Sequence, residues 1–160
     1  FSPATIGDGL SNTLGMSEVK ASQPNYWDGR NPSTVGVAAP AVPADLATFL
    51  GGTFDSNGHT EWVEGDVHEV GFTTTFAPNA KVMANVNGQP MDVDYTSMRD
   101  GESVTLPTYA AVTARSYHPS GLNALMMDGA VRSIKNTIDV RVWRSLGTRA
   151  GGEVVSSDSY

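Results

Sequence analysis

The sequence contains no cysteine among its 160 residues. A disulfide framework, a thiolate zinc site and a cysteine nucleophile are therefore excluded. Charged residues are also scarce, since they make up 17% of the chain against about 25% in an average globular protein. Glycine and proline, at 17 and 9 residues, are above their average share. This composition predicts a turn-rich protein and argues against both a long-helix protein and a chain disordered by its charge.

Long apolar runs are absent as well. No stretch of about 18 uninterrupted apolar residues occurs, so no segment of the printed chain predicts a transmembrane helix. The nearest candidate, residues 35–52, is interrupted by Pro40, Pro43 and Asp45. The chain opens on Phe1 and shows no leader, so we expect it to be a processed or trimmed piece of a longer protein.

Basic residues are few, because 10 Lys and Arg stand against 17 Asp and Glu and the formal net charge is −7. Binding of nucleic acid needs clustered basic side chains, so we expect no nucleic-acid partner. The acidic excess lies in residues 45–102, where ten acids face only Lys81 and Arg99. We expect cations or basic surfaces to be the partners of this acidic middle segment.

The pattern of apolar residues predicts an α+β fold that is mainly β, with antiparallel sheets and short helices. Alternation over residues 14–18 predicts a strand, and the β-branched and aromatic residues of 67–76 predict another. Residues 109–117 predict a buried strand. A short helix is expected to begin at Pro43 and to bury Leu46.

Two tight-turn signals predict hairpins. Residues 81–93 are centred on Asn-Gly, and residues 122–134 are centred on Asp128-Gly129, both of which suit two-residue turns. A two-residue turn at the second site would place Leu125 opposite Arg132. The outgoing strand is apolar on both faces, so we expect it at the centre of a sheet.

The end of the chain predicts a second helix. Asp139 is a good N-cap residue, and Trp143 and Leu146 lie on one face of the helix that would follow. No internal repeat or linker is visible in the sequence. We therefore expect one β-rich domain over residues 1–147 and a C-terminal tail over residues 148–160.

The acidic middle segment offers a metal-site hypothesis. Two histidines and three acids fall within ten residues: His59, Glu61, Glu64, Asp66 and His68. Residues two apart in a strand share a face, so His59 and Glu61 could converge, as could Glu64, Asp66 and His68. We favour the alternative of a solvated strand edge kept soluble by its charges, because no recognised metal-ligand spacing is present.

The same segment offers a calcium hypothesis. Asp55, Asn57, His59 and Glu61 place oxygen and nitrogen ligands at alternate positions, as a calcium loop does. The run lacks the bidentate Glu that completes an EF-hand, and residues 92–96 form a similar and equally incomplete pattern. An ordinary turn that is rich in Asp and Asn is the favoured alternative for both.

A serine, a histidine and an acid in the last third suggest a catalytic triad. His118 lies ten positions before Asp128, and Ser116 is nearby. No Gly-x-Ser-x-Gly elbow is present, and Asp128 already has a structural task in a turn. We favour a structural His118 at a sheet edge, whose ring nitrogens bond to backbone or to a carboxylate.

Four stretches together resemble one family: residues 6–18 with Asp-Gly-x-Ser-Asn-Thr-Leu, residues 59–76 with His-Thr-Glu-Trp-Val, residues 109–134 with Tyr-Ala-Ala-Val-Thr, and residues 139–155 with Leu-Gly-Thr-Arg-Ala-Gly-Gly-Glu-Val. In this order they resemble a planctomycete group of pseudopilin-like proteins that carry a prepilin-type leader. That group has a domain of unknown function and a C-terminal signature of His, nine residues and Asp-Gly. The resemblance identifies His118, Asp128 and Gly129 as signature residues.

The resemblance implies the head of a type IV pilin or type II secretion pseudopilin. In such proteins a long apolar N-terminal helix, missing from the printed chain, anchors the subunit in the membrane and then packs in a filament core. It implies a surface, extracellular or periplasmic location, and partners that are other copies or other pilin-like subunits. It carries over no enzymatic activity.

Three function hypotheses follow. The first is a non-catalytic structural subunit that forms the β-rich head of a pilin-like protein, with no cofactor. The second is an extracellular module that binds calcium or a saccharide through the acidic middle segment and aromatics such as Trp27 and Trp62. The third, which we rank last, is a metal-dependent hydrolase that uses His59, His68 and His118.

Overall fold

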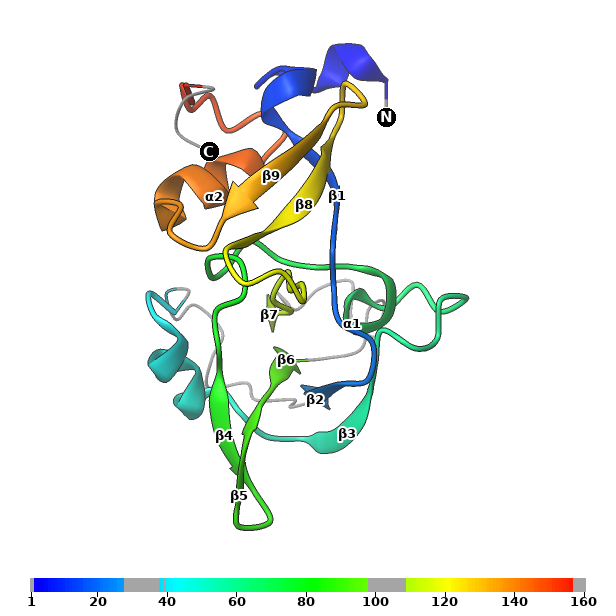
Figure 1. Cartoon of the computed structure of the whole chain (residues 1–160), viewed down its shortest axis with the longest axis vertical. Coiled ribbons are helices and arrows are strands. Elements are labelled where there is room, and N and C mark those ends of the chain that lie inside the picture. The colour runs from blue at the N-terminus through cyan, green and yellow to red at the C-terminus, as the bar shows by residue number, and fades with distance from the viewer. Residues whose placement is uncertain (1, 28–37, 39, 98–108, 157–160) are drawn as a thin grey trace.

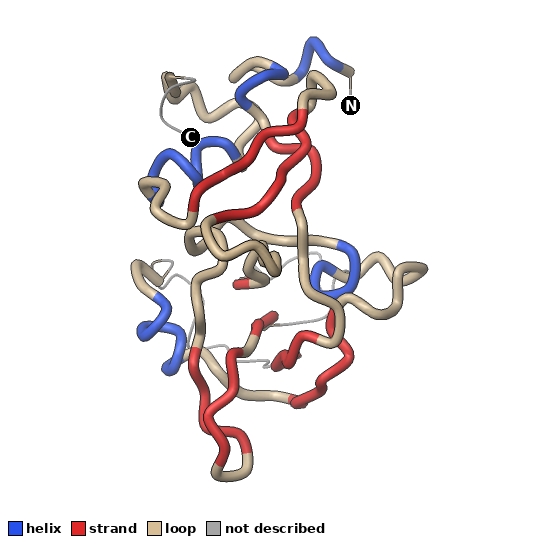
Figure 2. The backbone as a smooth tube through the Cα atoms, in the orientation of Figure 1, coloured by secondary structure: helices blue, strands red, loops and turns tan. Residues whose placement is uncertain are grey.

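The computed structural model describes residues 2–27, 38, 40–97 and 109–156. It has a mainly β fold with antiparallel sheets and short helices, arranged as two lobes that lie one above the other in Figure 1. The tube in Figure 2 shows that much of the backbone lies in loops and turns. The predicted α+β, mainly β class is confirmed.

The terminal lobe is built around a three-stranded antiparallel sheet in the order β1-β8-β9. Its strands are β1 (Leu14–Ser17), β8 (Gly121–Met126) and β9 (Val131–Lys135). The predicted strand at residues 14–18 and the central place of the 122–127 strand are confirmed. Two short 3-10 helices, η1 (Pro3–Thr5) and η2 (Leu10–Asn12), precede this sheet.

The helix α2 (Val140–Leu146) covers one face of that sheet. Asp139 caps it, because its Oδ1 accepts a hydrogen bond from the backbone N of Arg141 at 2.7 Å. Trp143 and Leu146 are fully buried against the sheet residues of the same apolar cluster. The predicted helix, its cap and its buried face are confirmed.

The middle lobe contains a four-stranded sheet in the order β3-β2-β6-β7 and a separate hairpin of β4 and β5. The pair of β2 and β6 is parallel and the other pairs are antiparallel. The strands are β2 (Gln23–Trp27), β3 (Thr53–Gly58), β4 (Met83–Val86), β5 (Gln89–Asp92), β6 (Asp94–Thr96) and β7 (Ala110–Ala111). The hairpin predicted at 81–93 is confirmed. The helix expected from Pro43 is the 3-10 helix η4 (Pro43–Thr48), which buries Leu46.

Each lobe has its own apolar cluster. Leu46, Val82 and Tyr95 lie in that of the middle lobe, and Leu122 and Trp143 lie in that of the terminal lobe. Because the first and last parts of the chain build one lobe and the middle builds the other, the backbone passes between the lobes repeatedly (Figure 1).

The segment that follows α1 (Val67–Val70) connects the lobes. Thr73 forms a parallel bridge with Thr113. Arg144 of α2 donates to the backbone O of Thr75 through Nε at 3.1 Å and Nη2 at 2.7 Å. Asn79 accepts from the backbone N of Ser116 at 2.8 Å and so holds the approach to β8. These bonds fix one lobe on the other.

The strand predicted over residues 67–76 is wrong. The chain forms the short helix α1 there, which Gly71 ends, and the residues that follow make only the bridge at Thr73. Strand propensity is overridden here because the helical turn brings the carboxylate of Glu69 back to the backbone N–H groups of Thr60 and Glu61.

The register predicted for the second hairpin is wrong by one residue. Leu125 lies opposite Val131, not Arg132. The turn has three residues, ending in Gly129 with φ +89°, and Met126 N donates to the O of Ala130 at 2.8 Å. A three-residue turn that ends in a left-handed glycine is the second common way to close a hairpin.

The strand predicted over 109–117 is also shorter than expected, since β7 has two residues, although Val112 to Arg115 are buried.

Candidate functional site

A buried carboxylate organises the most prominent loop of the middle lobe. Glu69 is 4% exposed. Its Oε2 accepts hydrogen bonds from the backbone N of Thr60 at 2.9 Å and of Glu61 at 2.8 Å. Both N–H groups therefore have an acceptor on the same buried oxygen. Glu69 therefore fixes the base of the loop formed by residues 60–66.

His59 lies beside this carboxylate and enters the loop with a left-handed backbone, φ 60°. Its backbone N donates to the O of His68 at 3.0 Å, and its Nδ1 lies 3.0 Å from the backbone O of Glu69. A carbonyl oxygen can only accept, so Nδ1 is the protonated nitrogen. Burial lowers the pKa of His59, which keeps the ring neutral near pH 7.

A buried ion network lies next to this loop. Arg115 is 2% exposed, and its Nη1 donates to Oδ1 of Asp94 at 2.5 Å. Its Nη2 and Nε donate to the two carboxylate oxygens of Asp92 at 3.0 and 3.3 Å. Burial raises the pKa of Asp94 to about 6, although Arg115 opposes that shift. Burial alone would lower the pKa of Arg115, but the two carboxylates raise it, so the guanidinium stays charged.

These carboxylates also hold backbone. Asp94 Oδ1 accepts from the N of Thr113 at 3.1 Å, and Asp92 Oδ1 accepts from the N of Val82 at 2.8 Å. Arg115 Nη1 donates in addition to the O of Thr113 at 3.2 Å. The network therefore joins the end of β5, β6 and the strand-like segment after β7.

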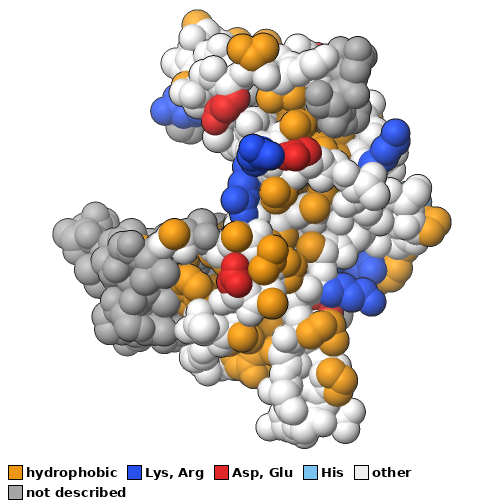
Figure 3. All heavy atoms as spheres, turned by 90° about the vertical axis from the view of Figure 1, so that its left-hand side faces the viewer, with side chains coloured by type: hydrophobic (Ala, Val, Ile, Leu, Met, Phe, Trp, Pro, Cys, Tyr) orange, Lys and Arg blue, Asp and Glu red, His pale blue; other side chains and the backbone are white. Residues whose placement is uncertain are grey.

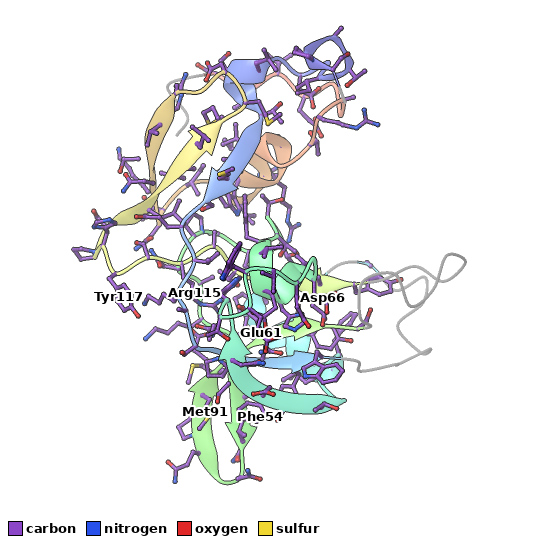
Figure 4. All side chains as sticks on the ribbon, turned by 90° about the vertical axis from the view of Figure 1, so that its right-hand side faces the viewer. Phe54, Glu61, Asp66, Met91, Arg115 and Tyr117 are labelled. Carbon is purple, nitrogen blue, oxygen red and sulfur yellow. The ribbon has the colours of Figure 1, made fainter. Side chains whose placement is uncertain are left out.

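The predicted metal ligands occupy three different positions. Asp55 and Asn57 lie in β3, where Asp55 accepts from the neighbouring backbone N of Ser56 and Asn57 donates to Glu61 Oε1 at 3.3 Å. Glu61, Glu64 and Asp66 lie in or at the end of the exposed loop, and Figure 4 labels the first and last of these. His59 and His68 lie at the buried base of the loop, where His68 Nε2 is 3.6 Å from Glu69 Oε1.

The shared strand faces predicted for these residues are wrong, because His59 is left-handed and His68 lies in α1. Across residues 2–27, 38, 40–97 and 109–156, no group of three His, Asp or Glu is placed to hold a metal ion. The metal and calcium sites stay predictions. The prediction omitted Glu69, the residue whose carboxylate binds the base of the loop.

His118 and Asp128 do not meet. They flank β8 at opposite ends, and six residues of strand span about 20 Å. His118 Nε2 lies 3.3 Å from Oε1 of Glu18, whose other oxygen accepts from the N of Asn123 at 2.6 Å. Asp128 Oδ1 accepts from the N of Ala130 within the hairpin turn, and Gly129 supplies the left-handed residue there.

Asp8 joins the two ends of the chain. Its Oδ1 accepts from the N of Gly152 at 2.8 Å, and its Oδ2 accepts from the N of Gly151 and from Thr148 Oγ1, both at 2.9 Å. These bonds lower the pKa of Asp8, with the bond from Gly152 as the largest cause. The first residues of the predicted tail are therefore bound to the domain.

Sequence reasoning did not single out Glu69, Arg115, Asp94 or Asp8 as the centres of these networks. A signal existed for two of them. Arg115 follows five apolar or small residues in a segment predicted to be buried, and a buried arginine needs carboxylate partners. Glu69 likewise lies in a segment with valines on both sides. Neither pattern identifies the partner, because the partner is distant in sequence.

A cleft of about 550 Å³ opens between the lobes. It is lined by the start of β1, the segment after α1 and the end of α2: Leu14, Gly15, Phe72, Thr73, Thr74, Thr75, Arg144 and Gly147. Figure 3 shows a hollow between the lobes, with Lys and Arg side chains on its wall. None of the helices in the described part of the chain is both long and apolar enough to span a membrane.

Residues 1–141 match the family model described as "Protein of unknown function (DUF1559)". The chain therefore belongs to that family. No curated protein and no solved structure matches the chain.

Proposed function

We propose that this member of the DUF1559 family is a non-catalytic structural subunit: the β-rich head of a pilin-like or pseudopilin-like protein. In this proposal the full-length precursor carries a prepilin-type leader and an apolar helix that anchors it in the membrane. The head is displayed at the cell surface, outside the cell or in the periplasm. Its partners are further copies or other pilin-like subunits.

One observation carries the proposal: within the described residues, four of the carboxylates that could perform chemistry, those of Glu18, Glu69, Asp94 and Asp128, each accept hydrogen bonds from backbone N–H groups. Glu69 binds the two N–H groups at the base of the 60–66 loop, and Asp94 binds Thr113 N. Glu18 binds Asn123 N, and Asp128 binds Ala130 N. A catalytic acid or base needs a lone pair or a proton free to reach a substrate, whereas these groups already stabilise turns and strands by hydrogen bonds.

The places of the signature residues agree with this use. Gly129 allows the turn after β8, and His118 lies beside Glu18 at the other end of the same strand. Both act on the central strand of the terminal lobe. A motif that closes a sheet suits a protein whose task is to keep a rigid shape.

The test is to image the full-length protein in its native envelope by immunogold electron microscopy. Surface or filament labelling is expected, and a variant that lacks the upstream apolar segment of about 20 residues is expected to lose it. Uniform cytoplasmic labelling of the unaltered protein would contradict the proposal.

A binding module is the second candidate, favoured by the indole of Trp62, which is 83% exposed beside the acidic residues Glu61 and Glu64. A ligand of the native state raises Tm by an amount set by RT ln(1 + [L]/Kd). A Tm that rises with calcium or with a saccharide panel, and that fails to rise in Trp62→Ala, would favour this candidate. Elemental analysis that finds stoichiometric transition metal would instead favour the hydrolase.

A further inference from the structure

The loop of residues 60–66, named here the Trp62 loop, presents two apolar side chains to solvent. Trp62 is 83% exposed and Val63 is 76% exposed. The loop projects between β3 and α1 at the right-hand edge of Figure 1. Single exposed apolar residues are common on protein surfaces, but an adjacent pair at the tip of a projecting loop is a typical anchor for a partner.

This loop is held in shape before any partner arrives. Glu69 binds its first two N–H groups, Thr60 Oγ1 donates to the O of Asn57 at 2.5 Å, and the N of Glu64 donates to the O of Glu61 at 2.9 Å. Little conformational freedom is left to lose on binding, which favours affinity.

The tip is also acidic. Glu61, Glu64 and Asp66 flank the two apolar residues. Glu61 accepts from Asn57, whereas the carboxylate of Glu64 has no hydrogen-bond or ion-pair partner within the described ranges. The loop therefore offers an indole and a free negative charge side by side.

The cleft between the lobes has the complementary chemistry. Leu14 and Phe72 give it apolar walls, and Arg144 gives it a positive charge. Arg144 Nε and Nη2 bind only the carbonyl oxygens of Thr75 and Pro40, and the described residues place no carboxylate within 4.0 Å of it. Its charge is therefore not neutralised, and Nη1 has no partner there.

The size of the cleft also suits an aromatic side chain. Its volume of about 550 Å³ falls in the range of roughly 300–1,000 Å³ typical of ligand pockets. Gly147 lets the end of α2 approach the wall of the cleft closely, because a Cβ at that position would lie 2.5 Å from Thr74 Oγ1.

The loop and the cleft lie on different sides of the molecule. The loop projects at the right of Figure 1, whereas the hollow between the lobes opens at the left-hand edge of Figure 3, which is the rear of Figure 1. They cannot meet within one chain. A contact between them therefore joins two copies head to tail, and such a contact can repeat into an open filament.

We propose that the Trp62 loop of one copy docks in the cleft of a second copy, with Trp62 against Leu14 and Phe72 and with Glu64 paired to Arg144. This inference rests on the proposed function. It gives the proposed structural subunit a specific contact between the β-rich domains of two copies. Opposite charges at the two surfaces favour this encounter and oppose pairing of like surfaces.

The test is sedimentation velocity of the 160-residue chain at concentrations up to about 1 mM. Trp62→Ala is expected to weaken self-association about 30-fold, as for an anchor residue. Glu64→Arg and Arg144→Glu are each expected to weaken it at least about tenfold. Lys135→Glu, an exposed charge reversal on β9, is the matched control for Arg144→Glu and is expected to leave association unchanged.

Mixing the two charge reversals gives the sharpest readout. Each variant alone places two like charges at the contact and so repels its own kind. In the mixture, the loop of either variant meets a cleft of opposite charge on the other variant. The mixture is therefore expected to regain the association that each variant lacks alone.

Arg144→Glu also loses the bonds to Thr75 and Pro40 and so could fail to fold. In that case Trp62→Ala and Glu64→Arg, both on the exposed loop, test the contact.

Unchanged association in Trp62→Ala and Glu64→Arg, or no association of the unaltered chain, would overturn the contact. Loss of saccharide binding in Trp62→Ala with association intact would overturn it as well. The proposed function is tested separately, by the envelope imaging. If the copies assemble through another face, this contact is contradicted but the proposal of a structural subunit is not.

Discussion

Arg115 and Asp94 form a buried ion pair, with Nη1 of Arg115 2.5 Å from Oδ1 of Asp94. Both side chains are almost fully buried. Such a pair stabilises a fold only when its other donors and acceptors are also satisfied. Here Asp92 takes the remaining edge of the guanidinium, while Thr113 donates its N–H to Asp94 and accepts from Arg115 through its O. The pair therefore fixes how three segments pack.

Asp94→Ala is expected to lower the free energy of unfolding at pH 7 by about 3–5 kcal/mol, because Arg115 Nη1 and Thr113 N would both lose their buried acceptor. Urea denaturation followed by tryptophan fluorescence measures this change. Asp45→Ala, at the start of η4 on the exposed surface, is a control in which the loss should stay near about 1 kcal/mol. Equal losses in the two variants would mean that the buried ion pair contributes no more to the free energy of unfolding than a surface carboxylate does.

Asp94 also predicts a pH dependence with a definite sign. Its pKa is about 6 in the folded chain and its ordinary value is 3.8, so the folded state holds the proton more tightly. The contribution of this proton to stability is therefore fully present below about pH 3.8 and is lost as the pH rises through 6. We expect the stability difference between the unaltered chain and Asp94→Ala to grow as the pH falls from about 7 to about 4. Urea midpoints at intervals of about one pH unit test this, and a constant difference would contradict it.

Glu69→Ala is expected to free the base of the Trp62 loop. The backbone N–H groups of Thr60 and Glu61 would lose their acceptor, at a cost of about 1–3 kcal/mol. Hydrogen exchange at these two amides should accelerate more than that of the β8 amides. Glu64→Ala removes an exposed carboxylate from the same loop and should leave both exchange rates unchanged. Protection that persists in Glu69→Ala would show that another acceptor holds the loop.

Local patterns were enough to predict the elements whose causes are local. Asp139 and the helix it caps, the hairpin at 81–93 and the strand at 14–18 each follow from a few neighbouring residues. The register after Leu125 was missed because Asp-Gly suits both a two-residue and a three-residue turn, and the choice depends on Met126 bonding Ala130. The helix α1 was missed because its cause, the bond from residues 60–61 to Glu69, spans eight or nine residues and overrides strand propensity.

The candidate site was harder to predict than the fold for a related reason. His59, Glu61 and His68 were singled out as residues of a chemical type, but what a carboxylate does depends on which donors reach it. Asp94 and Arg115 are 21 residues apart and meet only after β6 and β7 have paired. The sequence spacing of single residues contains no information about such a meeting.

The contacts of Glu18 and His118 predict that the two side chains contribute unequally to the free energy of unfolding. The imidazole is 59% exposed and makes a long contact of 3.3 Å, so His118→Ala should cost no more than about 1 kcal/mol. Glu18→Ala should cost more, because Asn123 N loses a short bond inside the terminal sheet. Thermal unfolding of both variants ranks them. A larger loss for His118→Ala would point to a role of the ring that its contacts do not explain.

Asp8 predicts that acid releases the end of the domain before the rest unfolds. Its pKa lies below the ordinary value of 3.8 because the N–H groups of Gly152 and Gly151 bind the ionised form. A lowered pKa means that the contribution of Asp8 is present above about pH 3.8 and is lost as the pH falls through the folded value. Asp8→Asn should mimic this release at pH 7, and trypsin should then cleave after Arg149 faster than in the unaltered chain. Asp139→Asn, which alters the cap of α2 in the same lobe, is the control and should leave that cleavage slow. If Asp8→Asn cleaves no faster than this control, residues 148–152 are held by contacts other than Asp8.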